Sequence, residues 1–252
     1  MAADSGWPTG VGRRIYDTLD STNAEAARLA PELAGPTWIL AREQTAARGR
    51  RGRPWQNPAG NFAATLVSRP DEPPERLALR SFVAALALRD AFVAVTGRPG
   101  SFALKWPNDV LLNGGKVAGI LLETLTGGGT PWALAVGVGV NLRMAPDRAE
   151  VEPGAVAPVS LMSETGACLT PEEFLDQLAP AYAMWESRLT TYGFAPVREA
   201  WLQNAARLGE TVTARTGRDS WEGRFETIDD SGALILVTAR GRQAIPAAEI
   251  HF

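Results

Sequence analysis

A short run of arginines and glycines constrains this chain more than any other feature. Residues 48–55 read Arg-Gly-Arg-Arg-Gly-Arg-Pro-Trp, so four guanidinium groups and one indole lie within a single short segment. Residues 38–41 before it and 61–68 after it have the apolar character of strands, which predicts a loop held between two strands. Glycines let a backbone approach a ligand closely, and guanidinium groups bind phosphate or carboxylate through paired hydrogen bonds. We therefore expect an anion-binding loop, with Trp55 available to stack on a flat ring.

The rest of the composition narrows what this loop can serve. The formal net charge is -3, so the positive charge is local, although a nucleic-acid-binding or solubilising segment would also be arginine-rich. The single histidine, His251, argues against a histidine-based metal site or a Ser-His-Asp triad. The single cysteine, Cys168, excludes an internal disulfide framework. With no signal peptide and no uninterrupted apolar run of about 18 residues, we expect a cytoplasmic protein that does not span a membrane.

Strand and helix patterns follow one another along the first four fifths of the chain. Strands are predicted at 38–41, 61–68, 102–106, 110–112, 116–122 and 132–142, and helices at 26–33, 76–96, 170–190 and 197–206. Thr22 with Glu25, and Thr170 with Glu173, fit capping boxes at two helix starts. Asn113-Gly114-Gly115 predicts a hairpin turn. The segment 146–158, rich in Ala, Gly and Pro, is expected to be a connector.

The pattern changes after Leu208-Gly209. Short alternating segments, separated by polar or glycine-containing turns, predict a small β-barrel at the C-terminus. These segments are 211–215, 221–228, 234–238 and 243–246. We therefore divide the chain into an N-terminal tail (1–14), a main domain (15–207) and a barrel domain (208–252).

Three further motifs are ambiguous when taken singly. Lys116 lies in an apolar strand just after the hairpin turn, and it either faces solvent or points inward at an anion. Asn108-Asp109 has the composition of an ordinary turn. Gly137 and Gly139 indicate either close approach of a ligand or chain segment, or tight packing of a buried strand.

In combination and in this order, the motifs resemble those of biotin–protein ligases, also called biotin–[acetyl-CoA-carboxylase] ligases. The matching segments are Ser21-Thr22-Asn23, Gln44, Arg48 to Trp55, Lys105-Trp106-Pro107-Asn108-Asp109, Lys116-x-Ala118-Gly119-Ile120-Leu121-x-Glu123 and Gly137-x-Gly139-x-Asn141. The resemblance runs from about Ile15 to the C-terminus. It implies an α+β fold of the class II synthetase type, with a central mixed sheet flanked by helices and an SH3-like C-terminal barrel.

The resemblance also implies a reaction in two halves. Biotin and ATP, with Mg²⁺, give biotinyl-5′-AMP and pyrophosphate, and the biotinyl group then passes to a lysine of a biotin carboxyl carrier protein, the carrier domain of a biotin-dependent carboxylase. Lys116, Arg50 and Asp109 are the implied catalytic residues, and Asp109 either binds Mg²⁺ or orients the incoming lysine. The implied biotin-binding residues are Ser21, Thr22, Gln44, Arg48, Arg50, Lys116 and Gly119. The residues implied for ATP or the adenylate are Arg48, Arg51, Arg53, Trp55, Asn108, Lys116 and Asn141.

Two departures from the family pattern bear on these expectations. Ala47 occupies the position of the first glycine of the family loop, and a positive φ at that position would strain an alanine. About 20 residues precede Ser21, too few for the winged helix-turn-helix of ligases that double as repressors, so no DNA partner is expected. Related ligases often dimerise through a sheet edge, which makes a homodimer a further expectation.

Two other functions compete with this interpretation. A lipoate–protein ligase shares the fold and the adenylation chemistry, but it would carry a different arginine–glycine signature with a histidine nearby. A non-catalytic RNA- or nucleotide-binding protein would use the arginine loop electrostatically, and its binding would weaken steeply with salt. That function leaves Lys116 and the segment 105–109 unexplained.

Overall fold

The main sheet has seven strands and mixed direction. The computed structural model describes residues 6–127, 130–151, 154–216 and 218–251. In these residues the strand order is β1-β2-β3-β7-β6-β5-β4. The first pair, β1 with β2, is parallel and the other neighbours are antiparallel, which confirms the expected mixed sheet. The strands are β1 (Gly12–Leu19), β2 (Thr37–Gln44), β3 (Phe62–Ser68), β4 (Phe102–Lys105), β5 (Asp109–Leu112), β6 (Gly115–Gly127) and β7 (Thr130–Val140).

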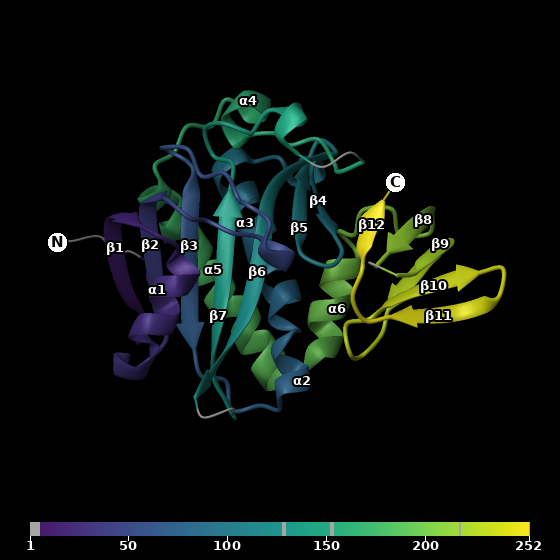
Figure 1. Ribbon diagram of the computed structural model, residues 1–252, viewed down its shortest axis with the longest axis horizontal. Helices are drawn as coiled ribbons and strands as arrows, with labels where there is room; N and C mark the ends of the chain where they lie inside the picture. Colours follow the sequence, from purple (N-terminus) through teal and green to yellow (C-terminus); the bar gives the residue numbers. More distant parts are fainter. Residues whose placement is uncertain (1–5, 128–129, 152–153, 217, 252) are drawn as a thin grey trace.

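Helices cover the two faces of this sheet unequally. The two long helices α3 and α5 pack against each other on one face, and the shorter α1 lies on the other face near β2, β3 and β7 (Figure 1). The helices are α1 (Thr22–Leu29), α2 (Pro74–Leu77), α3 (Arg80–Thr96), α4 (Leu161–Thr165), α5 (Pro171–Tyr192) and α6 (Phe194–Leu202). This leaves β5 and β6 without a covering helix on the α1 face, and the cavity described below lies there.

Local sequence explains where the long helices begin and end. Thr170 caps α5 by accepting a hydrogen bond from Glu173 N while the Glu173 side chain accepts from Thr170 N, so this predicted capping box is confirmed. The helix α3 ends at Gly97, whose φ of 67° is the left-handed conformation that glycine adopts without strain. Asn113 (φ 50°) and Gly114 (φ 84°) form the predicted hairpin turn between β5 and β6.

Two helix predictions are wrong in detail. The helix expected over 76–96 is interrupted, because the backbone N–H groups of Leu79, Ser81 and Phe82 bond three residues back and tighten the chain between α2 and α3. The capping box expected of Thr22 and Glu25 does not form. The Thr22 N–H, which the Glu25 side chain would accept in that box, is bonded to Gln44 Oε1 on β2, and the Glu25 N–H is bonded to Ser21 O. Ser21 is the N-cap of α1 and makes no side-chain capping bond.

The C-terminal strands form one antiparallel sheet in the order β11-β10-β9-β8-β12. They are β8 (Thr211–Arg215), β9 (Ser220–Ile228), β10 (Leu234–Thr238), β11 (Gly241–Ile245) and β12 (Glu249–His251). Within the described residues β11 pairs only with β10, and β12 only with β8, so the expected barrel is an open sheet. The outer strand β12 instead borders the cavity in the main part of the molecule.

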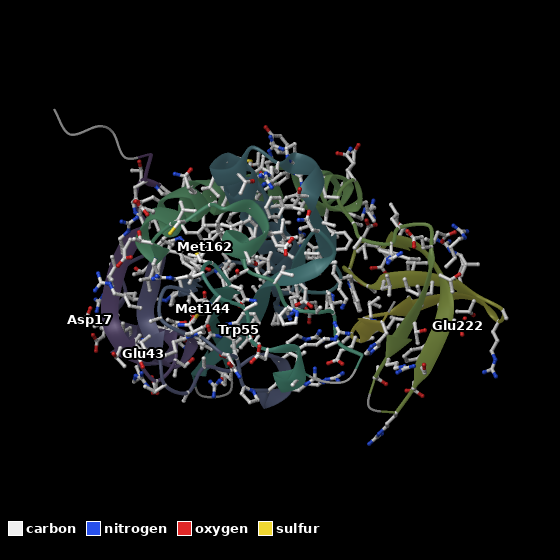
Figure 2. All side chains as sticks on the ribbon, turned by 90° about the horizontal axis from the view of Figure 1, so that it is seen from above. Asp17, Glu43, Trp55, Met144, Met162 and Glu222 are labelled. Carbon is white, nitrogen blue, oxygen red and sulfur yellow. The ribbon has the colours of Figure 1, made fainter. Side chains whose placement is uncertain are left out.

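The C-terminal sheet is fastened to the main sheet through a continuous core. Trp106 is buried and its indole Nε1 donates to the carbonyl of Gly232 at 3.1 Å. Phe82 on α3 packs edge-on against Trp201 of α6, and residues of both sheets belong to the same hydrophobic cluster. Seen from above, this sheet stands to one side with Glu222 on it, whereas Trp55 lies near the middle of the molecule (Figure 2). No helix in the described ranges is long and apolar enough to cross a membrane.

Candidate active site

A cavity of about 400 Å³ opens on the α1 side of the main sheet. Its walls are the arginine loop between β2 and β3, the start of α1, strands β5 to β7, residues 154–158 and β12. Twelve of the residues expected at the site line it: Ser21, Thr22, Gln44, Arg48, Arg50, Arg53, Trp55, Asn108, Asp109, Lys116, Gly119 and Asn141. Arg51 is the expected site residue that does not line it. Segments far apart in sequence thus meet around one space.

Glycines form the floor of the cavity because side chains there would collide with its walls. On β7, Val136, Val138 and Val140 face the helix-covered core, so alternation turns Gly137 and Gly139 toward the cavity. A Cβ at Gly139 would lie 2.6 Å from two indole atoms of Trp55. A Cβ at Gly137 would lie 2.3 Å from Asn23 Oδ1. The close approach indicated by these glycines is therefore an approach of the Trp55 and Asn23 side chains.

The arginine loop is held by backbone hydrogen bonds across its neck. Gly49 N donates to Arg53 O at 2.7 Å, and Trp55 N donates to Ala47 O at 3.0 Å. The turn at its tip uses left-handed conformations at Arg51 (φ 59°) and Gly52 (φ 74°), which direct Arg51 away from the cavity. Ala47 is not among the described residues with positive φ, so the absence of the family glycine causes no backbone strain there.

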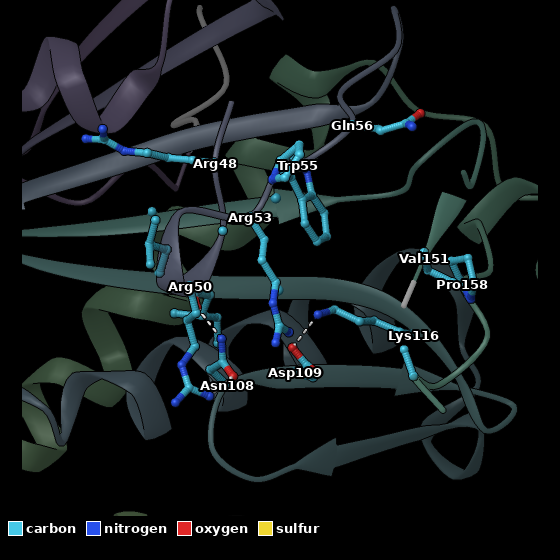
Figure 3. Close-up of a pocket in the computed structure, with 18 of the residues that line it drawn as sticks. Arg48, Arg50, Arg53, Trp55, Gln56, Asn108, Asp109, Lys116, Val151 and Pro158 are labelled. Atoms are coloured by element: carbon cyan, nitrogen blue, oxygen red, sulfur yellow. Dashed lines mark hydrogen bonds and ion pairs between the residues drawn. The ribbon is translucent and has the colours of Figure 1, made fainter. Parts of the chain in front are cut away.

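The arginines of the loop have different partners. Arg50 reaches Asn108 Oδ1 at 3.3 Å, and burial lowers the pKa of its guanidinium. Arg53 and Arg51 pair with Glu249 of β12 at 2.8 and 3.3 Å. Burial alone would raise the pKa of Glu249, but the hydrogen bond from Arg53 and the arginine charges around it hold that pKa below its usual value. In the close-up, Arg50 and Arg53 extend toward Asn108 and Asp109, whereas Arg48 extends the other way (Figure 3).

Two lysines share one carboxylate beside the arginines. Lys116 Nζ on β6 lies 2.7 Å from Asp109 Oδ1 on β5, and Lys105 Nζ on β4 lies 3.9 Å from Asp109 Oδ2. Burial lowers the pKa of Lys105 despite the attraction of Asp109. The strand lysine Lys116 is thus turned into the cavity and is partly buried.

The described residues around Asp109 do not form a Mg²⁺ site by themselves. The described part of the chain contains no group of three or more His, Cys, Asp or Glu side chains placed to hold a metal. Asp109, the residue expected as a ligand, faces two ammonium groups. A magnesium ion there would depend on oxygens supplied by a bound phosphate chain.

The remaining expected residues give the cavity two polar ends. At one end Gln44 Oε1 accepts from Thr22 N at 2.7 Å, and Ser21 and Thr22 are buried. At the other end Asn141 Nδ2 donates to Val159 O at 3.1 Å, while its buried Oδ1 has no hydrogen-bond partner among the described residues. An unpaired buried acceptor is costly, so Asn141 Oδ1 is a ready partner for a ligand N–H.

Two parts of the wall were not expected from sequence. Residues 157–159, at the end of the segment expected to be a connector, run beside β6 at the lysine: Lys116 N donates to Ala157 O, and Val159 N donates to Lys116 O. Glu249, Ile250 and His251 bring β12 to the cavity. A short C-terminal strand carries no local signal that it will meet a loop about 200 residues earlier. The hydrophobic character of 154–158 was the only available signal for the first segment.

Comparison with known proteins identifies relatives of this arrangement. Residues 11–141 match the biotin/lipoate A/B protein ligase family, and residues 208–252 match the biotin protein ligase C-terminal domain. A biotin–[acetyl-CoA-carboxylase] ligase of Paracoccus denitrificans is 63% identical over 233 residues, which are 92% of this chain and 97% of the relative. A bifunctional ligase/repressor of Bacillus subtilis is 31% identical over 94% of this chain and 72% of its own length.

The solved structures agree on the fold. A biotin protein ligase from Aquifex aeolicus in complex with biotin and ATP superposes with a TM-score of 0.82, covering 95% of this chain and 97% of that one. At 24% identity this likeness supports the architecture and not the roles of single residues. The two family matches and the high identity to the Paracoccus relative carry the assignment: the chain belongs to the biotin/lipoate A/B protein ligase family and, within it, to the biotin protein ligases.

Proposed function

We propose that this chain is an ATP-dependent biotin–protein ligase. The observation that carries the proposal is the meeting of three groups in one cavity: the arginine loop, the Lys116–Asp109 pair and the polar end at Thr22 and Gln44. An acyl-adenylate has a compact heterocycle at one end, a carboxylate–phosphate junction in the middle and a nucleoside at the other end. We propose that the polar end at Thr22 and Gln44, the Lys116–Asp109 pair and the Trp55–Asn141 side bind these three parts in that order.

We assign the end at Ser21, Thr22 and Gln44 to the cyclic urea of biotin. That group carries two N–H donors and one carbonyl, and it needs both acceptors and donors in a space with little water. Thr22 and Ser21 are each 5% exposed or less, and Gln44 holds the Thr22 backbone in place. Gly119 leaves the space above β6 open, because a Cβ there would already lie 3.2 Å from Trp55.

We assign the phosphates and the carboxylate to Arg48, Arg50, Arg53 and Lys116. The first half reaction displaces pyrophosphate at the α-phosphorus by the biotin carboxylate, so in-line positioning and charge neutralisation matter more than proton transfer. Arg53 is now paired with Glu249, and a triphosphate would compete with that carboxylate for the guanidinium. Arg51, outside the cavity, contributes at longer range to the same positive field.

Lys116 is the residue we place at the junction where negative charge develops. Its ammonium lies 2.7 Å from Asp109 and 5.5 Å from the centre of the Trp55 ring, so two neighbours fix its direction. The same position serves the second half reaction, in which the amine of a carrier lysine attacks the acyl carbon and AMP leaves. We propose that Asp109 holds Lys116 in this position. Magnesium, where it takes part, neutralises phosphate charge, and we assign no ligand to it.

The nucleoside belongs at the Trp55 and Asn141 side of the cavity. Asn141 Oδ1, buried and without a protein partner among the described residues, suits the exocyclic amino group of adenine. Asn108 braces this region, since its Nδ2 donates to Ile120 O at 2.6 Å and its Oδ1 faces Arg50. The partner of the second half reaction is the lysine-bearing carrier domain of a biotin-dependent carboxylase. We propose the cytoplasm as the compartment, and we leave a homodimer through the exposed edge strand β1 as a proposal.

The test is exchange of labelled pyrophosphate into ATP, measured with biotin, with lipoate and with neither. Of the two acids, only biotin should support exchange. The first half reaction is reversible, and lipoate has no cyclic urea to bind at the Thr22–Gln44 end. Exchange that lipoate supports equally would assign the chain to the other branch of its family.

A further inference from the structure

A chain of hydrogen-bonded polar side chains, buried except for Glu123, runs behind the urea-binding end of the cavity. Asn23 Nδ2 donates to Glu123 Oε2 at 2.6 Å. Thr65 Oγ1 lies 2.6 Å from Asn23 Oδ1 and 2.8 Å from Thr22 Oγ1. Thr22, Asn23 and Thr65 are 4%, 5% and 0% exposed, so solvent does not compete for the bonds among these three, whereas the Glu123 side chain is 33% exposed. Thr22 and Asn23 line the cavity, whereas Thr65 and Glu123 do not.

The carboxylate of Glu123, at the end of this chain, fixes the direction of the hydrogen bonds as far as Thr65. A carboxylate only accepts, so Glu123 holds the Asn23 amide with its nitrogen toward β6 and its oxygen toward Thr65. Asn23 Oδ1 can then only accept, and the one hydroxyl proton of Thr65 must go to it. Thr65 Oγ1 is left as an acceptor, so the Thr22 hydroxyl proton has two acceptors within reach, Thr65 Oγ1 at 2.8 Å and Gln44 Oε1 at 3.2 Å.

The consequence appears at Thr22, the member of the chain that a ligand can touch. Both acceptors of its hydroxyl proton, Thr65 Oγ1 and Gln44 Oε1, belong to the protein, so its lone pairs are what it offers to a ligand in the cavity. Its backbone N–H is bonded to Gln44 Oε1, and this bond fixes the position of the first residue of α1 relative to β2. A hydroxyl fixed in this way selects a ligand that donates an N–H.

We propose that Glu123 and Asn23 are positioning residues that set the donor–acceptor direction of Thr22 and thereby select the N–H group of a cyclic urea. This inference rests on the proposed function and deepens it. Glu123 acts through Asn23 and Thr65, without contact with the ligand. The second Glu123 oxygen, 3.5 Å from an Arg48 guanidinium nitrogen, ties the same carboxylate to the arginine loop.

The sharpest test exchanges the amide and the carboxylate of the Asn23–Glu123 pair. Asn23→Asp places two carboxylates about a hydrogen bond apart, and repulsion disrupts the chain. Biotin KM and Kd should rise about tenfold or more, because a buried acceptor loses its donor. Adding Glu123→Gln supplies an amide donor to the new carboxylate at position 23, whose other oxygen still accepts from Thr65. The double variant should return to within about threefold of the wild type in biotin affinity.

A second pair of variants changes Glu123 itself: one keeps an acceptor oxygen for Asn23, and the other removes it. Glu123→Gln keeps a carbonyl oxygen for Asn23 Nδ2 and should change biotin affinity only a few-fold, whereas Glu123→Ala should lower it about tenfold. Glu226→Gln is the matched control, since it makes the same change on a strand of the C-terminal sheet, where Glu226 pairs with Arg242. It should leave both biotin and ATP parameters unchanged.

The readouts separate positioning from a merely structural role. In Asn23→Asp, which leaves the Glu123–Arg48 pair in place, KM for ATP should stay near the wild-type value. The preference for biotin over a biotin methylated on a ureido nitrogen should narrow in Asn23→Asp and Glu123→Ala. A structural role alone predicts a lower melting temperature with that preference unchanged. Failure of the double variant to improve on Asn23→Asp, or wild-type affinity in Asn23→Asp, overturns the positioning role. Wild-type protein without biotin binding would instead contradict the proposed function itself.

Discussion

Substitution of Gly139 by alanine tests whether the glycine floor exists to admit Trp55. The new Cβ would lie 2.6 Å from Cε2 and Nε1 of the indole and 2.9 Å from Cζ2. Ordinary van der Waals contact begins near 3.4 Å, so the indole must move away by about 0.8 Å. Overpacking of this kind costs about 1–3 kcal/mol, which corresponds to about 5- to 150-fold in an equilibrium constant. Because Trp55 belongs to the arginine loop, we expect this free-energy cost to weaken the binding of biotin and ATP.

Gly119 provides the matched control for this prediction. It pairs with Gly139 across β6 and β7 and faces the same indole, but its added Cβ would lie 3.2 Å from Trp55 Cζ3. A shift of a few tenths of an ångström relieves that contact, so Gly119→Ala should raise KM by no more than a few-fold. Trp55→Phe in the Gly139→Ala background removes the atoms that clash and should restore part of the lost affinity.

The assay is the KM for biotin and for ATP in pyrophosphate exchange, with the melting temperature recorded for every variant. We expect both KM values of Gly139→Ala to be well above those of Gly119→Ala, and the melting temperatures of both variants to stay close to that of the wild type. Equal KM values for the two alanine variants would refute this expectation, because the steric difference between 2.6 and 3.2 Å would then have no effect.

Two further predictions concern charges at the site. Lys116→Ala should lower kcat for adenylation by about two to three orders of magnitude, because it removes a donor from the reacting junction; near-normal single-turnover adenylation would contradict that role. Glu249→Gln should speed trypsin cleavage in the arginine loop, because the ion pairs with Arg51 and Arg53 hold the loop against β12. The pKa of Glu249 is lowered in the folded protein, so its contribution is present above its unfolded pKa, near 4.5, and is lost as pH falls through the lower folded value. Hydrogen exchange of loop amides should show this acid-side loosening in the wild type and not in the variant.

Sequence predicted best those elements whose cause is local. The capping box at Thr170 and the hairpin turn at Asn113 depend on side chains within a few residues, and both form as predicted. The capping box at Thr22 and Glu25 was predicted by the same rule and does not form, although α1 does begin at Thr22, because Gln44 on another strand takes the Thr22 N–H. Tertiary competition of this kind leaves no trace in a local pattern.

The strand β1 was missed for a related reason. Its residues are mostly exposed, as expected of an edge strand, so they show no alternation of apolar and polar side chains. Its parallel partner, β2, lies beyond α1 in the chain, and that pairing is non-local. Nothing within Gly12–Leu19 therefore distinguishes a strand from an exposed loop.

The motifs located the site well but did not separate its functions. Trp106 belongs to the same short motif as Asp109, yet it is buried and anchors the C-terminal sheet through Gly232. Glu249 had no signal at all, because its contact with Arg51 spans 198 positions in the sequence. Residue type and order can indicate a shared cavity, whereas the partner of each charge follows only from the fold.

Pyrophosphate exchange is the reaction that shows whether biotin and ATP meet in this cavity, as we propose. We expect the wild type to show exchange that requires biotin and that lipoate does not support. We also expect Lys116→Ala to lose nearly all of this exchange while remaining folded. A folded wild-type sample, supplied with magnesium and biotin, that shows no exchange above the biotin-free level would contradict the account.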